Sequence, residues 1–179
     1  LDSTNLPLAT STGRMADFSA FKGQMQLAEA SFGQGATLIT PLAIARLTAT
    51  IANGGEVIQP CMVDYVETVG NRRTTSGRGE QLGRAVSAQT ATTVAGMMRA
   101  VVEQGTGAVA GIGGLRAAAK TGSAQHPSGD PHAWFTCFAP YDAPELVVTV
   151  IVENGGSGAE TAGPIAVEVL RAALSDRIR

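Results

Sequence analysis

The chain of 179 residues is poor in charge, lysine, cysteine and aromatic residues, and it has no long apolar run. Charged residues make up 16% of it and the formal net charge is -2, so it lacks the basic field that gathers phosphates, and no nucleic acid is expected as a partner. No run approaches the roughly 18 to 20 apolar residues that a helix needs to cross a bilayer. Any membrane anchor is therefore expected outside this chain.

The two cysteines and two histidines do not suggest a metal site. Cys61 and Cys137 have neither C-x-x-C spacing nor histidine-rich surroundings, and no metal or cofactor is expected. His126 and His132 flank a turn-forming stretch, and we expect His126 at the surface and His132 partly buried at the start of a strand. Hydrophobic residues nevertheless make up 44% of the chain, which is enough for a core of its own.

Polar residues, glycine and proline dominate the first forty positions, which predicts loop with little regular structure. Residues 1–35 are therefore expected to be a loop-rich lead-in, and the residues after Lys22 do not predict a helix. Thr40 then offers an N-cap oxygen, and Pro41 suits the first position of a helix. Apolar residues recur at helical spacing after it, which predicts a helix from Pro41 to Ala52. The series is Leu42, Ala45, Ala49 and Ala52.

The middle of the chain predicts short extended segments and then a second helix. Extended segments with a break are expected from Val57 to Val69, and an exposed loop is expected from Asn71 to Gly83. Ser87 can cap a helix that ends before Gly105. Its inward face would hold Val94, Met97 or Met98, Val101 and Val102.

The last third predicts three strands and a covering helix. The strands are Leu115 to Gln125, Ala133 to Ala139 and Leu146 to Val152. The connection between the second and third is too short for a parallel crossover, so these strands are expected to be antiparallel. Gly163-Pro164 then opens a helix with Ile165, Val169, Ala172 and Ala173 on the stripe that covers the sheet. The fold class is α+β, an antiparallel sheet covered by helices.

Lysine is nearly absent, because the chain has only Lys22 and Lys120 among its 13 basic residues. Lys120 is followed by Thr121-Gly122-Ser123, at the end of a predicted strand. The glycine lets a ligand approach the backbone and the two hydroxyls can donate, so this K-T-G-S segment could bind a carboxylate or an oxyanion. Its other interpretation is a strand that ends in a polar turn.

A series of motifs surrounds this segment in a fixed order along the chain. The motifs are Phe32-Gly33-Gln34-Gly35, Thr40-Pro41-Leu42, Ala52-Asn53-Gly54-Gly55, Gly105-Thr106-Gly107, Ala119 to Gln125, His132-Ala133-Trp134-Phe135, Ala139-Pro140, Val152 to Gly156 and Gly163 to Ala166. Together they resemble the C-terminal half of the transpeptidase domain of class B penicillin-binding proteins, whose fold is shared with serine β-lactamases. The resemblance covers most of residues 1–179.

The resemblance implies roles for the K-T-G-S residues. Lys120 would hold a proton network and supply positive potential, and Thr121 and Gly122 would complete the catalytic motif. Thr121 and Ser123 would offer hydroxyls to the terminal carboxylate of the substrate, and the backbone N–H of Ser123 would form half of the oxyanion hole. The strand edge from Ser123 to Gln125 would pair with the substrate backbone. Gly105 and Thr106 would have a structural role at the end of a helix.

The nucleophile motif of the family, S-x-x-K, is not expected in this chain. Ser19-Ala20-Phe21-Lys22 satisfies the pattern, and Ser3-Thr4-Asn5 satisfies the family's second motif, S-x-N. In the family, however, S-x-x-K precedes S-x-N, and both lie well before the G-Q-G element. We therefore expect both matches to be accidental.

As a member of this family, the chain would belong to a serine D,D-transpeptidase that crosslinks peptidoglycan stem peptides through an acyl-enzyme and binds β-lactam antibiotics covalently. The missing N-terminal half of the domain would supply the nucleophile, and the protein would act at the extracytoplasmic face of a bacterial membrane. Two alternatives stay open. One is a serine β-lactamase or D,D-carboxypeptidase of the same fold, and the other is a non-catalytic sensor or structural module.

Overall fold

The computed structural model describes residues 9–175 except residues 12, 15, 16, 64, 71, 76–78, 112, 113, 126 and 128. Its helices are α1 (Gln24–Ser31), α2 (Pro41–Ala52), α3 (Ala88–Gln104) and α4 (Gly163–Ser175), with 3-10 turns η1 (Phe18–Ala20) and η2 (Ala108–Gly111) and a π-helical turn η3 (Gly158–Ala162). Its strands are β1 (Glu56–Ile58), β2 (Tyr65–Glu67), β3 (Arg73–Thr75), β4 (Gln81–Arg84), β5 (Ala118–Ala124), β6 (His132–Ala139) and β7 (Leu146–Val152).

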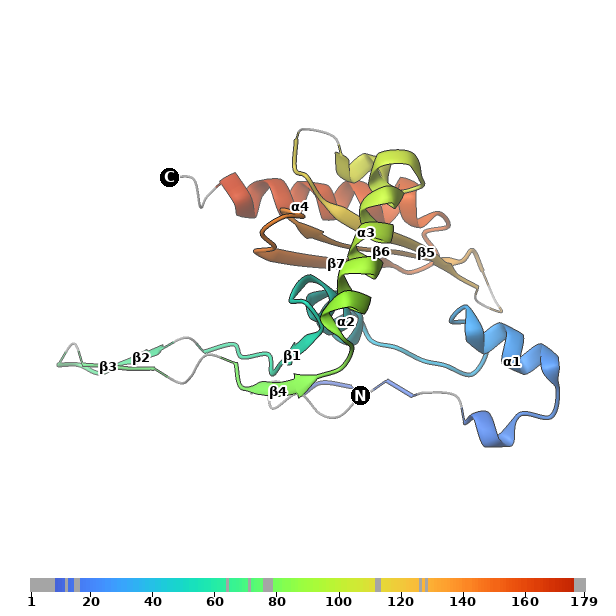
Figure 1. The fold of residues 1–179 in the computed structure, drawn as a ribbon, viewed down its shortest axis with the longest axis horizontal. Helices are drawn as coiled ribbons and strands as arrows, with labels where there is room; N and C mark the ends of the chain where they lie inside the picture. Colours follow the sequence, from blue (N-terminus) through green and yellow to red (C-terminus); the bar gives the residue numbers. More distant parts are fainter. Residues whose placement is uncertain are drawn as a thin grey trace.

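The centre of the fold is an antiparallel sheet with the order β5-β6-β7. Helix α4 covers one face and α2 covers the other (Figure 1). Helix α3 packs against β5 and contributes Val102 to the core under α4 and Met98 to the core on the α2 side. Lys120, Thr136 and Thr149 are directly opposed on the three strands, so they share the face toward α2. The predicted α+β class, the three strands and their antiparallel pairing are confirmed.

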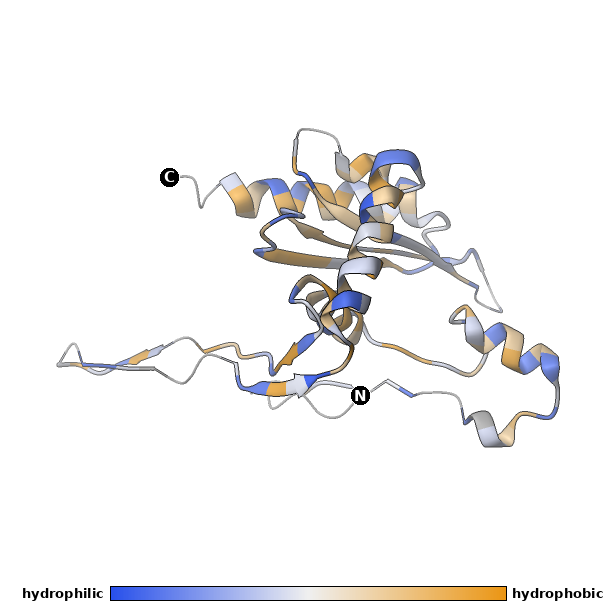
Figure 2. Ribbon diagram, viewed as in Figure 1, coloured by the Kyte–Doolittle hydropathy of each residue, from blue (hydrophilic) through white to orange (hydrophobic). Residues whose placement is uncertain are grey.

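The larger core lies between the sheet and α4. Phe135 and Leu170 are fully buried there, together with small residues of β5 and β6. Figure 2 shows that β7, which also contributes to this core, is hydrophobic along its length. Burying these side chains supplies the main stabilisation, at roughly 1.5 to 3 kcal/mol for each large one.

The expected stripe of α4 is wrong, although the helix itself is confirmed. Its buried residues are Gly163, Ala166, Val167 and Leu170, while Ile165 and Val169 are 45% and 47% exposed. The helix is apolar nearly all round, so periodicity could not choose its face. Close packing does so, because a Cβ on Gly163 would lie only 2.8 Å from Val109 and 3.3 Å from the Phe135 ring.

Helices α2 and α3 begin and end close to the predicted residues. The hydroxyls of Thr40 and Ser87 cap their first turns by accepting the N–H of Ala43 and Thr90. Met98, not Met97, is the buried methionine of α3. The most buried residues of α2 are Ala43, Thr48 and Thr50, and none of them belongs to the expected apolar series.

Three threonine hydroxyls join α2 to the sheet. Thr48 Oγ1 lies 2.8 Å from Thr136 Oγ1, which lies 2.7 Å from Thr149 Oγ1. Because Thr48 is buried, this chain of hydrogen bonds satisfies polar atoms that would otherwise be costly to remove from water. The chain therefore fixes where α2 sits across β6 and β7.

Two small antiparallel sheets lie apart from the central sheet, one beside α2 and the other projecting away from it (Figure 1). Strand β1 pairs with β4, and β2 pairs with β3. The expected loop from Asn71 to Gly83 is therefore wrong in part, because it contains β3 and most of β4. The side chains described on these strands are exposed and show no apolar alternation, so only the backbone pairing reveals the strands.

Helix α1 corrects the expectation that no helix follows Lys22. It buries no residue and has no side-chain hydrogen bond at its N-cap, Gly23, so periodicity and N-cap patterns both miss it. Its residues from Gln24 to Ala30 are good helix formers, and the helix ends in a Schellman motif. In that motif Gly33, at φ +85°, donates its N–H to Ala30 O, and Gln34 donates its N–H to Glu29 O.

Candidate active site

The K-T-G-S segment lies on β5, at the edge of the sheet. Among the described strands β5 pairs only with β6, so its other side is free of a strand. Residues of an edge strand bond alternately inward and outward, and the N–H and C=O of one residue point the same way. The carbonyls of Thr121 and Ser123 both receive side-chain donors, from Lys120 Nζ and Gln34 Nε2, which places Thr121 and Ser123 among the outward residues. The N–H of Ser123 therefore faces the open edge.

A hydrogen bond from another part of the chain holds the Thr121 side chain. Its Oγ1 lies 2.8 Å from Oγ1 of Thr106, in the Gly105-Thr106-Gly107 turn. That turn ends α3, because the N–H groups of Gly105 and Gly107 both donate to Val101 O. The turn ends a helix, as expected, and it also holds the Thr121 hydroxyl. Sequence reasoning missed this contact, since 15 residues separate the two threonines.

The remaining expected residues lie near the same edge. Lys120 and Ser123 are exposed, and Gln125 is exposed one residue beyond the end of β5. Gln34 was not among the expected site residues, yet its Nε2 donates to Ser123 O at 3.3 Å, across 89 residues of sequence. The G-Q-G motif already contained this residue, but nothing in the sequence indicated where its side chain would lie.

A second glycine supports Gly122 from beneath. A Cβ on Gly158, in the π-helical turn, would lie 2.5 Å from Gly122 O and 2.3 Å from Trp134 O. Gly122 and Trp134 are paired across β5 and β6, so only glycine lets η3 pack this closely on their backbone. The π-helical turn thus supports the strand at the position of the K-T-G glycine. Periodicity could not predict this contact.

Ser19 and Cys137 are not placed to act as nucleophiles at this edge. Ser19 Oγ donates to Asp17 Oδ1, and this bond with the Ser19 N–H holds the pKa of the Asp17 carboxyl below its usual value. No hydrogen bond joins Ser19 to Lys22 within the described residues, and η1 lies beyond α1 as seen from the sheet (Figure 1). Burial raises the pKa of the Cys137 thiol to about 12, which leaves it protonated. Ser3 and Asn5 lie outside the described residues.

The histidines and acidic residues form no metal site in the part of the chain that the structure describes. His132 is half-buried at the start of β6, as expected, and its Nδ1 accepts the N–H of Asn154 at 3.0 Å. This bond ties the start of β6 to the turn after β7. The expectation for His126 falls on a residue outside the description. No described helix is long and apolar enough to span a membrane.

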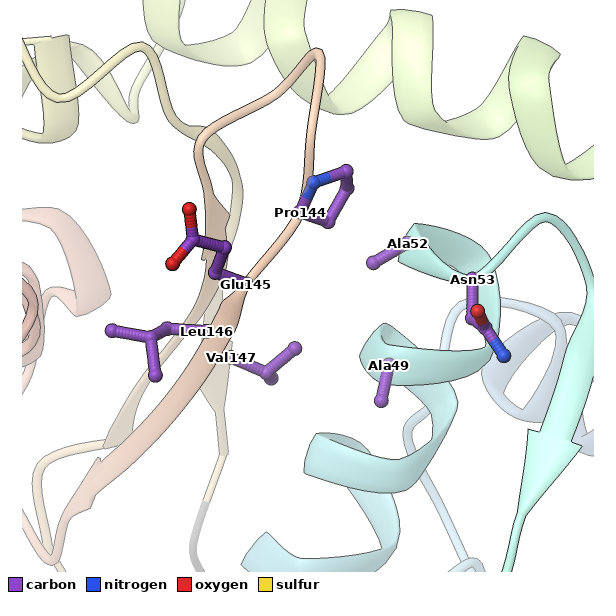
Figure 3. A pocket seen from close by; sticks show the side chains of 7 residues that line it. All are labelled: Ala49, Ala52, Asn53, Pro144, Glu145, Leu146 and Val147. Atoms are coloured by element: carbon purple, nitrogen blue, oxygen red, sulfur yellow. The ribbon is translucent and has the colours of Figure 1, made fainter. Parts of the chain in front are cut away.

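A cavity of about 150 Å³ lies at the opposite edge of the sheet, between α2 and the start of β7 (Figure 3). It is lined by Ala49, Ala52, Asn53, Pro144, Glu145, Leu146 and Val147. Val147 points toward α2, whereas Leu146 belongs to the core beneath α4. Its lining includes none of the K-T-G-S residues, so the cavity is separate from the edge that carries them.

These features, an edge strand carrying K-T-G-S on an antiparallel sheet between helices, agree with the family comparison. The sequence model of the penicillin-binding protein transpeptidase domain matches residues 8–174, and the chain belongs to this family. The resemblance stated from the motifs is thereby confirmed.

Particular relatives are found among mycobacteria. The peptidoglycan D,D-transpeptidase PbpA of Mycobacterium tuberculosis is 38% identical over 96% of this chain and 35% of its own length, and PbpA of Mycolicibacterium smegmatis is 35% identical over 95% and 34%. The crystal structure of PBPA from M. tuberculosis aligns with a TM-score of 0.84 at 34% identity, covering 94% of this chain and 41% of that one. The chain thus spans about a third of the length of the curated relatives that it matches.

Proposed function

We propose that this chain is the part of a serine D,D-transpeptidase that carries the K-T-G strand. The observation behind this proposal is that Thr121 and Ser123 direct their backbone groups to the open edge of β5, with Lys120 beside them. Such an edge can accept an extended peptide as an added strand. The relatives named above are D,D-transpeptidases, and one related structure is an imipenem acyl-enzyme complex.

In the proposed reaction, a serine oxygen attacks the carbonyl carbon between the two terminal D-alanines of a peptidoglycan stem peptide. An ester forms to the serine, and the last D-alanine leaves as an amine that takes up a proton. The amine of a second stem peptide then attacks the ester, which forms the crosslink and releases the serine. A β-lactam follows the first step only, by opening its ring.

Each residue of the edge has one task in this proposal. The ammonium of Lys120 supplies positive potential and contributes to the proton network around the serine, and the hydroxyls of Thr121 and Ser123 bind the terminal carboxylate. The Ser123 N–H binds the oxyanion, and Gly122 leaves room beside the strand. Gln125 extends the edge that pairs with the substrate backbone.

The serine lies in an N-terminal part of the domain outside these 179 residues, in this proposal. That part would also lead to the membrane anchor, with the domain on the extracytoplasmic face. The assignment of residues 1–179 to the C-terminal half of the domain rests on the order of the family's motifs.

Labelling with a fluorescent penicillin tests the proposal. The longer protein should be labelled at a serine before Leu1, and the isolated chain should not be labelled. In the longer protein, Lys120→Ala should slow acylation by at least about 100-fold, the scale of a positioned electrostatic or proton-transfer group. Lys22→Ala is the matched control, since it removes the chain's other lysine, and it should leave the rate unchanged.

Three other results would change the proposal. Stoichiometric labelling of the isolated chain at Ser19 would make that serine the nucleophile. Rapid hydrolytic turnover of penicillin by the longer protein would favour a β-lactamase or carboxypeptidase. Absence of any labelled serine would favour a non-catalytic module.

A further inference from the structure

The outer edge of β5 is not bare, because side chains of the protein already bind its outward carbonyls. Lys120 Nζ donates to Thr121 O, and Gln34 Nε2 donates to Ser123 O. An edge strand offers these acceptors to any added strand, and proteins commonly cover them. The Lys120 contact is local to the strand, whereas the Gln34 contact comes from a different part of the chain.

The turn at the end of α1 fixes the backbone of Gln34, and the side chain extends from there to β5. It is the residue after the Schellman glycine of α1, and its N–H donates to Glu29 O at 2.9 Å. The two flanking glycines, Gly33 and Gly35, have φ of +85° and +79°, a region that other residues rarely adopt. The turn that ends α1 therefore delivers the Gln34 amide to the edge.

The hydrogen bond from Gln34 to Ser123 affects how a ligand can bind to β5. Its N–H and C=O both face outward, so a ligand that adds to β5 as a strand offers an acceptor to the N–H and a donor to the C=O. In the structure the Gln34 amide donates to the Ser123 carbonyl in place of the ligand. We propose that Gln34 is a specificity-determining residue that competes with the ligand's acylamino N–H for the Ser123 carbonyl. This inference rests on the proposed function, which brings a peptide to this edge.

This competition should weaken the binding of ligands that carry the acylamino N–H. In the resting protein the Ser123 carbonyl is paired with Gln34, so a ligand N–H exchanges one neutral hydrogen bond for another and gains little. Without the Gln34 amide, the same N–H replaces only water. A ligand that ends before this N–H leaves Gln34 in place and is indifferent to it.

Two ligands that differ by the acylamino group test this competition. N-acetyl-D-alanyl-D-alanine carries the N–H, and propionyl-D-alanine keeps the terminal carboxylate and the adjacent amide but ends before it. Their dissociation constants for the isotope-labelled full chain are measured by NMR titration, which needs no nucleophile. Gln34→Ala should tighten binding of the acetylated dipeptide about two- to ten-fold, the worth of one neutral hydrogen bond, and leave propionyl-D-alanine unchanged.

Two further variants sharpen the test. Gln34→Asn keeps the amide but shortens its reach, and it should behave as Gln34→Ala does. Gln24→Ala removes a glutamine at the other end of α1 and should change neither constant. The NMR spectrum of each variant also reports whether it is folded.

Three results would overturn the proposal. Gln34→Ala could tighten the binding of both ligands equally, it could weaken the binding of the acetylated dipeptide, or neither ligand could bind at all. Failure of the proposed function has a different signature, since it appears as absence of penicillin labelling in the longer protein. The dissociation constants do not depend on that labelling.

Discussion

The β5-β6-β7 sheet and the two small sheets beside it are held together in different ways. In the central sheet, Phe135 and Phe138 are at most 1% exposed and helices cover both faces. In the small sheets, Tyr65 and Val66 are 45% and 55% exposed, and the strands depend on backbone pairing and surface ion pairs. Burial therefore stabilises the first region and contributes little to the second. The K-T-G-S residues lie on the first.

The largest difference should appear when one aromatic side chain is removed from each region. Phe135→Ala should lower the free energy of unfolding by about 3 to 5 kcal/mol, because it leaves a cavity beneath α4. Tyr65→Ala should cost about 1 kcal/mol or less, because the ring is about half exposed to water. The ring also stacks with Arg73, whose Cζ lies 4.4 Å from the ring centroid. Urea denaturation followed by circular dichroism measures both values. Equal costs would mean that the small sheets share the core's stabilisation.

Adding one methyl group gives the next largest difference. Gly158→Ala should destabilise the protein by about 1 to 3 kcal/mol, because the new Cβ would overlap the backbone of Gly122 and Trp134. Gly70→Ala, in the β2–β3 turn, meets nothing within 4 Å and should stay within about 0.5 kcal/mol. Hydrogen exchange should also be faster at the amides of β5 in the Gly158 variant. Unchanged exchange there would show that η3 does not support the strand.

The hydrogen-bonded threonines predict a cost of similar size on the α2 face. Thr136→Val keeps the shape of the side chain but leaves the hydroxyls of Thr48 and Thr149 without this partner, and it should cost about 1 to 3 kcal/mol. Thr93→Val is the control, because its exposed hydroxyl bonds only Gln89 O within its own helix. Thermal unfolding compares the two variants. A neutral Thr136→Val would mean that the remaining hydroxyls find other partners.

The smallest effect is expected in the β2–β3 sheet. Glu67→Gln removes the ion pair in which Arg73 Nε lies 3.0 Å from Glu67 Oε2. Both side chains are exposed, so the loss should not exceed about 1 kcal/mol at low salt and should disappear at high salt. Denaturation at two ionic strengths measures it. A cost that persists at high salt would indicate packing, not charge, between these strands.

The pattern of correct and incorrect predictions follows the same division. Helices α2 and α3 and strands β5, β6 and β7 combine capping or strand-forming residues with buried faces, and the sequence predicted all of them. Helix α1 and strands β3 and β4 have no buried side chain among their described residues, so periodicity gave no signal for them. The expected stripe of α4 failed for another reason, because a helix that is apolar on several sides can bury any of them.

The sequence by itself determined the class of fold, the order of its main elements and the position of Lys120, Thr121, Gly122 and Ser123 at a strand. Capping, turn residues and short-range periodicity are local properties, and a single chain displays them directly. The tertiary structure alone decided that Gln34, Thr106 and Gly158 meet this strand, from 89, 15 and 36 residues away. Such contacts depend on how close two backbones can approach and on which carbonyls point outward. The packing of the whole sheet decides the approach of the backbones and the direction of the carbonyls. The types of the contacting residues do not set either one.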